Sequence, residues 1–77
     1  MELNYKQLKL LDDQQYLEHN IKKGLYVKRS KNETYYLDSR KGHWQSYMVD
    51  KQGEINNYST NIILQLNALS ENQSTLF

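Results

Sequence analysis

The side chains best suited to recognise another molecule lie in the middle of the chain, where positive charge and aromatic rings alternate. Seven of the ten Lys and Arg residues fall between residues 22 and 43, although the whole chain carries a net charge of only +1. Rings that stack on bases, together with cations that contact phosphates, are typical of modules that hold single-stranded nucleic acid. The candidate nucleic-acid-binding cations are Lys23, Lys28, Arg29, Lys31, Arg40 and Lys41, with Tyr26 or Trp44 for stacking.

The same stretch also predicts a protein-binding surface. Tyr, Trp, Met and Arg are enriched in the cores of protein interfaces, and all four types occur between residues 40 and 48. Strand alternation places Tyr26 and Lys28 on one face, opposite to Leu25, so Tyr26 is the ring that we expect to be most exposed. The candidate partner-binding residues are Tyr26, Arg40, Trp44, Tyr47 and Met48.

Catalytic and metal-binding groups are sparse. His19 and His43 are the two histidines, and neither has further ligands at a spacing that metal sites use. The hydroxyl groups of Ser46, Ser59 and Thr60 have no activating base near them in the sequence. We therefore expect no enzyme activity, no metal site and no cofactor.

Length and composition narrow the class of protein. A chain of 77 residues buries only about 60% of its unfolded surface, which leaves little material for a deep substrate pocket. The absence of cysteine excludes a disulfide scaffold and favours a reducing compartment. The first residues do not form a signal peptide, and the longest apolar run is three residues, so we expect a cytoplasmic protein without a membrane span.

A helix is predicted over residues 4–23, where apolar residues recur at roughly helical spacing. Asp12 and Asp13 interrupt this stripe, which predicts a kink or break. Lys22, followed by Lys23 and Gly24, is typical of a helix end, because cations and a left-handed glycine complement the last carbonyl groups.

Short β-type runs follow, separated by polar turns. Residues 39–42 and 50–53 each begin with Ser or Asp and end with Gly, which is the pattern of a type I turn. Such short connections join antiparallel neighbours, so the middle of the chain predicts a meander. The predicted strands cover residues 25–29, 34–38, 43–49 and 54–58.

The last predicted element is a helix over residues 60–70, with a competing interpretation as a buried fifth strand from Ile62 to Leu66. Residues 71–77 predict a polar tail. The fold class that we expect is a single α+β domain over residues 1–77. It has an N-terminal helix, a three- to four-stranded antiparallel meander and a C-terminal helix packed on one sheet face.

The function that we expect is that of a small non-enzymatic protein-binding module. The excess of Lys over Arg and the many Asn and Tyr residues suggest AT-rich coding DNA, which favours a phage- or mobile-element-encoded regulator or inhibitor of a host protein. The alternative is a nucleic-acid-binding module, against which the near-neutral charge counts. An unpaired edge at residues 25–29 or 54–58 could also accept a partner strand and form an edge-strand dimer.

Overall fold

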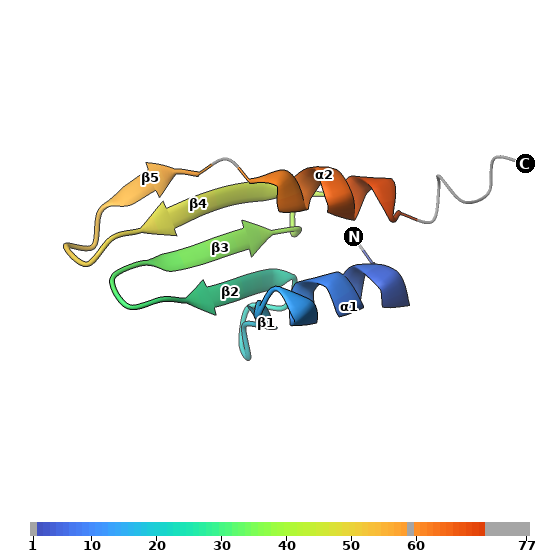
Figure 1. Ribbon diagram of the computed structural model, residues 1–77, viewed down its shortest axis with the longest axis horizontal. Coiled ribbons are helices and arrows are strands. Elements are labelled where there is room, and N and C mark those ends of the chain that lie inside the picture. The colour runs from blue at the N-terminus through green and yellow to red at the C-terminus, as the bar shows by residue number, and fades with distance from the viewer. Residues whose placement is uncertain (1, 59, 71–77) are drawn as a thin grey trace, which may run out of the picture.

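The computed structural model describes residues 2–58 and 60–70, and it consists of a five-stranded antiparallel sheet with a helix at each end of the chain (Figure 1). The strands lie side by side in chain order, β1-β2-β3-β4-β5. The elements are α1 (Tyr5–Asp13), β1 (Leu17–Glu18), β2 (Leu25–Arg29), β3 (Thr34–Asp38), β4 (Gln45–Val49), β5 (Ile55–Asn57) and α2 (Asn61–Ala68).

The α+β class with an antiparallel meander is confirmed, but the sheet has five strands rather than three or four. The additional strand is β1, which lies within the segment predicted to be helical and pairs Leu17 with Val27. The strands predicted at residues 25–29 and 34–38 have the predicted bounds, whereas β4 and β5 are shorter than predicted. The polar tail predicted at residues 71–77 lies outside the described residues.

The helix predicted over residues 4–23 is wrong in its second half, because α1 ends at Asp13. Gln15 adopts a left-handed conformation with φ of 68°, and the two backbone bonds that end the helix run from Gln15 N to Asp12 O and from Tyr16 N to Leu11 O. This is the Schellman arrangement, in which an apolar contact usually joins the two outer residues. Leu11 and Tyr16 are both buried in the same cluster, and this burial offsets the cost of the left-handed glutamine.

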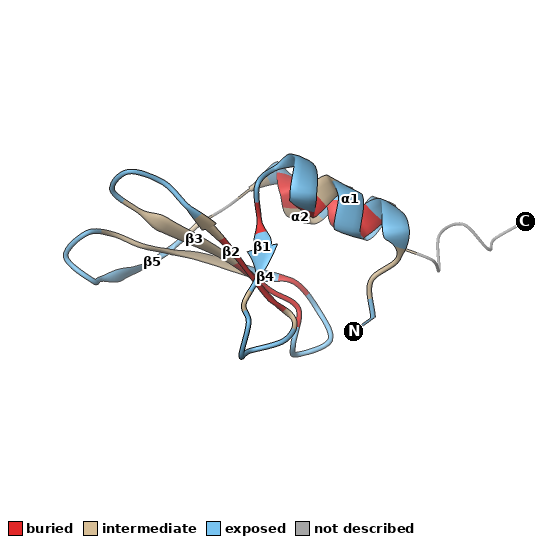
Figure 2. Ribbon diagram, turned by 90° about the horizontal axis from the view of Figure 1, so that it is seen from below, coloured by how far each residue is buried: buried red, intermediate tan, exposed pale blue. Residues whose placement is uncertain are grey.

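Both helices lie on the same side of the sheet, near one of its ends (Figure 2). The core that they form with the sheet contains Leu11 from α1 and Leu66 from α2, packed with Tyr26, Leu37 and Trp44 from the strand region. The alternative of a fifth strand at Ile62–Leu66 is therefore wrong, because this segment is helical and buries one side. Antiparallel sheets tolerate such one-sided cover, since their strands alternate between two faces.

Two amide side chains connect the beginning of α1 to the end of α2. Asn4 and Gln7 form a capping box, in which Gln7 N donates to Asn4 Oδ1 and Asn4 N donates to Gln7 Oε1. The remaining amide groups reach across the fold, where Gln7 Nε2 donates to Leu66 O at 2.9 Å and Asn4 Nδ2 donates to Leu69 O at 2.6 Å. The two residues thus satisfy free donors of one helix and free acceptors of the other. We call these four bonds the amide clamp.

The Gln7→Glu variant tests the clamp, because glutamate keeps the acceptor of the capping box but has no donor for Leu66 O. Gln7 is only 4% exposed, so the carbonyl would lose its partner inside the protein. We expect the free energy of unfolding to fall by ~1–3 kcal/mol in urea titrations. Gln65→Glu makes the same chemical change at an exposed position of α2 and should change it by less than ~0.5 kcal/mol. Equal losses in the two variants would contradict the clamp.

Candidate functional site

The face of the sheet opposite the helices carries a pair of stacked tyrosines. Tyr36 on β3 lies directly across from Tyr47 on β4, and the two ring centroids are 5.0 Å apart with an interplanar angle of 19°. Both rings are half-buried. Because cross-strand partners share a face, the strand register also defines their neighbours on this side. We call this side of the sheet the open face, and its strand residues are Leu17, Leu25, Val27, Arg29, Thr34, Tyr36, Asp38, Gln45, Tyr47, Val49, Ile55 and Asn57.

Apolar side chains are most exposed at the two borders of the open face. Leu17 on β1 is 68% exposed and Ile55 on β5 is 72% exposed, and each lies next to an outer edge of the sheet. Val27, between them, is buried. Neither helix lies on this side (Figure 2), so the tyrosine pair and the apolar borders face outward together.

An ion pair lies at the helix end of the open face. Arg40 Nη2 donates to Asp38 Oδ2 at 2.8 Å and Arg40 Nε donates to Asp38 Oδ1 at 3.0 Å, so the guanidinium holds the carboxylate in a bidentate geometry. These bonds lower the pKa of Asp38 below its ordinary value of 3.8. Burial raises the pKa of Tyr47, and the nearby Asp38 carboxylate raises it further. The pair therefore holds one cation close to Tyr47, beside the stacked rings.

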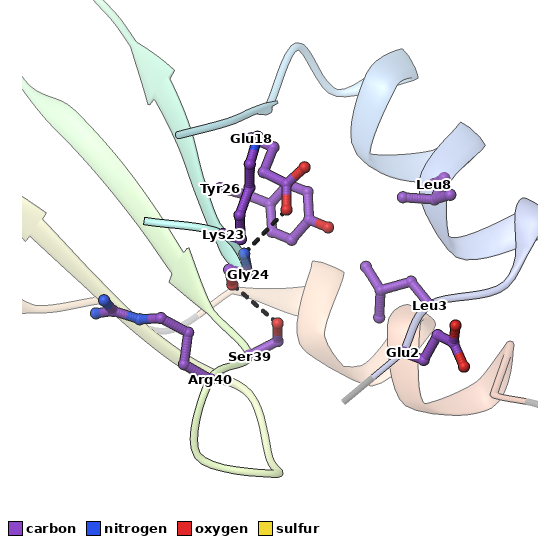
Figure 3. Close-up of a pocket in the computed structure, with 9 residues that line it drawn as sticks. All are labelled: Glu2, Leu3, Leu8, Glu18, Lys23, Gly24, Tyr26, Ser39 and Arg40. Atoms are coloured by element: carbon purple, nitrogen blue, oxygen red, sulfur yellow. Dashed lines mark hydrogen bonds between the residues drawn. The ribbon is translucent and has the colours of Figure 1, made fainter. Parts of the chain in front are cut away.

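A cleft of about 530 Å³ lies on the other side, between α1 and the beginning of β2 (Figure 3). Leu3 and Leu8 line it from the helical side, and the Tyr26 side chain points toward it from the sheet (Figure 3). Glu2 and Glu18 line it together with Lys23 and Arg40, so the four charged lining residues carry no net charge. These residues do not select an anionic or a cationic ligand.

Gly24 sits at the junction of the two loops beside this cleft. Its N–H donates to Glu18 Oε2 at 2.9 Å, and its carbonyl accepts from the Ser39 hydroxyl at 2.8 Å. Its φ is +91°, and a Cβ here would lie 3.0 Å from Arg40 Cγ. Gly24 is thus required where two loops meet, and it does not cap a helix as its sequence context predicted.

The predicted exposure of Tyr26 is wrong, because this ring and Trp44 belong to the core under the helices, each 7% exposed. Strand alternation separates two sets of side chains correctly, but the helices cover the set that contains Tyr26. Met48 shares the helix side of the sheet, since it lies across from Tyr35, which packs against the core. Of the predicted partner-binding residues, the structure therefore places only Tyr47 on the open face, and Arg40 lies next to the end of this face, bound to Asp38.

The predicted nucleic-acid surface is divided between the two ends of the sheet. Lys23, Arg40 and Lys41 lie in the segments before β2 and after β3, at the end where the helices lie, whereas Arg29 and Lys31 lie at the β2–β3 turn (Figure 1). Five-residue strands separate these ends by about 15 Å. Lys28 lies over the Tyr16 ring at 5.7 Å, on the helix side. The cations and the stacked rings do not form one continuous patch.

Among the residues of the open face that were not predicted as site residues are Leu17, Tyr36 and Ile55. The role of Tyr36 could have been inferred, because the predicted turn between the second and third strands places Tyr36 opposite Tyr47. The positions of Leu17 and Ile55 followed from no local pattern, because their exposure depends on which face the helices leave uncovered.

Potential metal ligands do not gather within residues 2–58 and 60–70, where no group of three or more His, Cys, Asp or Glu side chains could hold an ion. His19 Nδ1 accepts from the N–H groups of Ile21 and Lys22, at 3.1 Å and 3.0 Å, and so stabilises a turn. In the same described part of the chain, no helix is long and apolar enough to cross a membrane.

Comparison with known proteins adds no relative: no protein-family model, no curated protein and no solved structure matches this chain.

The Asp38→Asn variant tests the ion pair through its dependence on pH. A carboxyl group whose pKa is lowered in the folded state stabilises the fold above its unfolded pKa and loses this effect as pH falls. We expect Asp38→Asn to lower the free energy of unfolding by ~1–3 kcal/mol at pH 7 and by much less near pH 2, in urea titrations.

The exposed pair between Lys9 and Asp13 supplies the control, since its atoms are 3.8 Å apart and both side chains are more than half exposed. Asp13→Asn should change the free energy of unfolding by less than ~0.5 kcal/mol at either pH. A deficit in Asp38→Asn that stays the same from pH 7 to pH 2 would show that the carboxylate charge has no role.

Proposed function

We propose that this chain is a small non-enzymatic protein-binding module that contacts its partner through the open face. The observation that carries the proposal is the one-sided placement of the helices, which leaves the stacked pair of Tyr36 and Tyr47 uncovered (Figure 2). Tyrosine binds well at interfaces, because a rigid ring buries much area and its hydroxyl still forms a hydrogen bond.

The composition of the open face indicates the chemistry of the partner. Its centre is aromatic and apolar, while Arg29 lies at one end and Arg40, held by Asp38, lies next to the other. Such a surface matches a protein patch with an apolar centre and acidic residues around it. A regulator or inhibitor of a larger protein would act in this way, by occupying a surface of its target.

Two serine hydroxyl groups of the described residues donate to backbone carbonyl groups, which are not bases. Ser39 Oγ donates to Gly24 O, and Ser46 Oγ donates to Tyr58 O. Activation of a serine requires a base within hydrogen-bond reach of the hydroxyl. These contacts favour a binding role over a catalytic one.

Position-specific photo-crosslinking tests which surface contacts the partner. A benzophenone amino acid at Tyr47 should give a covalent adduct with one protein in a lysate of the source cells. The same amino acid at Leu64, which is 68% exposed on α2, should give none. Tyr36→Ala should weaken capture of that protein at least ~10-fold, because an interface tyrosine is commonly worth more than ~1.4 kcal/mol.

An adduct that forms from position 64 and not from position 47 would contradict the assignment of the open face. Titration with labelled single-stranded and duplex nucleic acid at two salt concentrations tests the class of partner. Micromolar binding that weakens steeply with salt would contradict a protein partner, because that dependence reports phosphate contacts.

A further inference from the structure

Within residues 2–58 and 60–70, the outer edge of β5 is an unpaired strand edge that lacks the usual protection against pairing. β5 is the last strand of the sheet, and all three of its residues are exposed. Edge strands are normally protected by lysine, proline, a bulge or a covering segment, whereas β5 reads Ile-Asn-Asn. Both helices lie toward the other end of the sheet in two views, so neither runs alongside this edge (Figures 1 and 2).

The strand register shows which backbone groups of β5 face outward. Asp50 N donates to Glu54 O at 3.1 Å, so residues 50 and 54 form a hydrogen-bonded pair. Antiparallel pairs alternate, which makes Met48 and Asn56 the next hydrogen-bonded pair along the strands. The N–H and C=O groups of Ile55 and Asn57 therefore point away from β4, toward the free edge.

The other edge of the sheet is less suited to accept a strand. The edge predicted at residues 25–29 is largely covered, because β1 pairs with Tyr26 and Val27. The end of β2 beyond β1 carries Lys28 and Arg29, and such charges protect a strand edge against pairing. β1 itself has two residues, and one of them is Glu18, whose carboxylate is bound to Gly24 N. The free pairing groups of the sheet are thus concentrated on β5.

We propose that β5 pairs with β5 of a second copy of this chain, in antiparallel orientation about a two-fold axis through Asn56. In this register Asn56 faces Asn56 of the second copy, and Ile55 faces Asn57 of the second copy in a hydrogen-bonded pair. The outward backbone groups on each copy then all find partners. The result is a continuous sheet with the helices of both copies on the same side.

The chemistry of the edge favours a second copy over an unlike strand. The self-paired register brings no two like charges together, because the residues that face one another are Asn56 with itself, Ile55 with Asn57, and Glu54 with Tyr58. Amide side chains opposite one another can exchange hydrogen bonds across the axis. Ile55 gains cover on the open face, where it is 72% exposed in the monomer.

The contact is small, so the dimer is weak and transient. A three-residue strand edge buries far less than the ~1,000 Å² of a stable interface. We expect a dissociation constant on the order of 0.1–1 mM, and a weight-average mass that rises with concentration in sedimentation experiments. This inference does not depend on the proposed function, because Tyr47 and Tyr36 lie outside the paired edge.

A single introduced cysteine tests the register directly, because the chain has none of its own. Asn56→Cys places two thiols across the two-fold axis, at a separation that a disulfide can bridge. Gln52→Cys, at the exposed tip of the β4–β5 turn, is the matched control, since the two copies of residue 52 would lie about 25 Å apart. Under mild oxidation, Asn56→Cys should form covalent dimer at least ~10-fold faster than Gln52→Cys. Equal rates would overturn the proposal.

Blocking the edge supplies the second test. Ile55→Pro removes an N–H that points away from β4, and so it should stop crosslinking of Asn56→Cys without breaking a bond inside the monomer. Ile55→Lys keeps the backbone donor and places two cations on diagonal positions about 8 Å apart, so it should slow crosslinking by less than ~5-fold. Circular dichroism confirms that each variant is folded. Undiminished crosslinking in a folded Ile55→Pro variant would also overturn the proposal.

Discussion

The amide clamp between Asn4, Gln7 and the last carbonyl groups of α2 is the interaction on which the rest of the arrangement depends. A helix of eight or nine residues has nearly half of its backbone groups without internal partners, so short helices need their ends satisfied by other parts of the protein. The clamp does this for both helices at once. Its two long-range bonds join residues whose separation in the chain is 59 positions for Gln7 and Leu66 and 65 positions for Asn4 and Leu69. It also joins the two helices to each other, on the same side of the sheet (Figure 2).

Placement of both helices on one side divides the aromatic residues into two groups with different roles. Tyr26 and Trp44 lie under the helices and supply two of the three aromatic rings of a small core. Tyr36 and Tyr47 lie on the other side, where they stack on each other and remain half exposed. The division follows from strand alternation combined with one-sided cover, and it creates a surface suited to a protein partner beside an edge suited to a second copy.

The helices and strands whose signals lie in neighbouring residues could be predicted from the sequence. The bounds of β2 and β3 follow from β-branched and aromatic runs between polar turns, and α2 follows from the spacing of Ile62 and Leu66 after a Thr60 cap. The break predicted at Asp12 and Asp13 lies where α1 ends, but the helix was expected to continue to residue 23. This end was not expected, because Gln15 takes the left-handed position that glycine usually fills. The open face could not be predicted either. Strand alternation defines two sets of side chains, but it does not show which set the helices cover.

Nuclear Overhauser effects between aromatic rings and helix methyl groups test the one-sided cover most directly. Ring protons of Tyr26 and Trp44 should show contacts to methyl groups of Leu11, Ile62 or Leu66, with which they share the core. Ring protons of Tyr36 and Tyr47 should show contacts to each other and none to those methyl groups. Contacts from Tyr36 or Tyr47 to the methyl groups of either helix would contradict the account, because the proposed binding surface would then be part of the core.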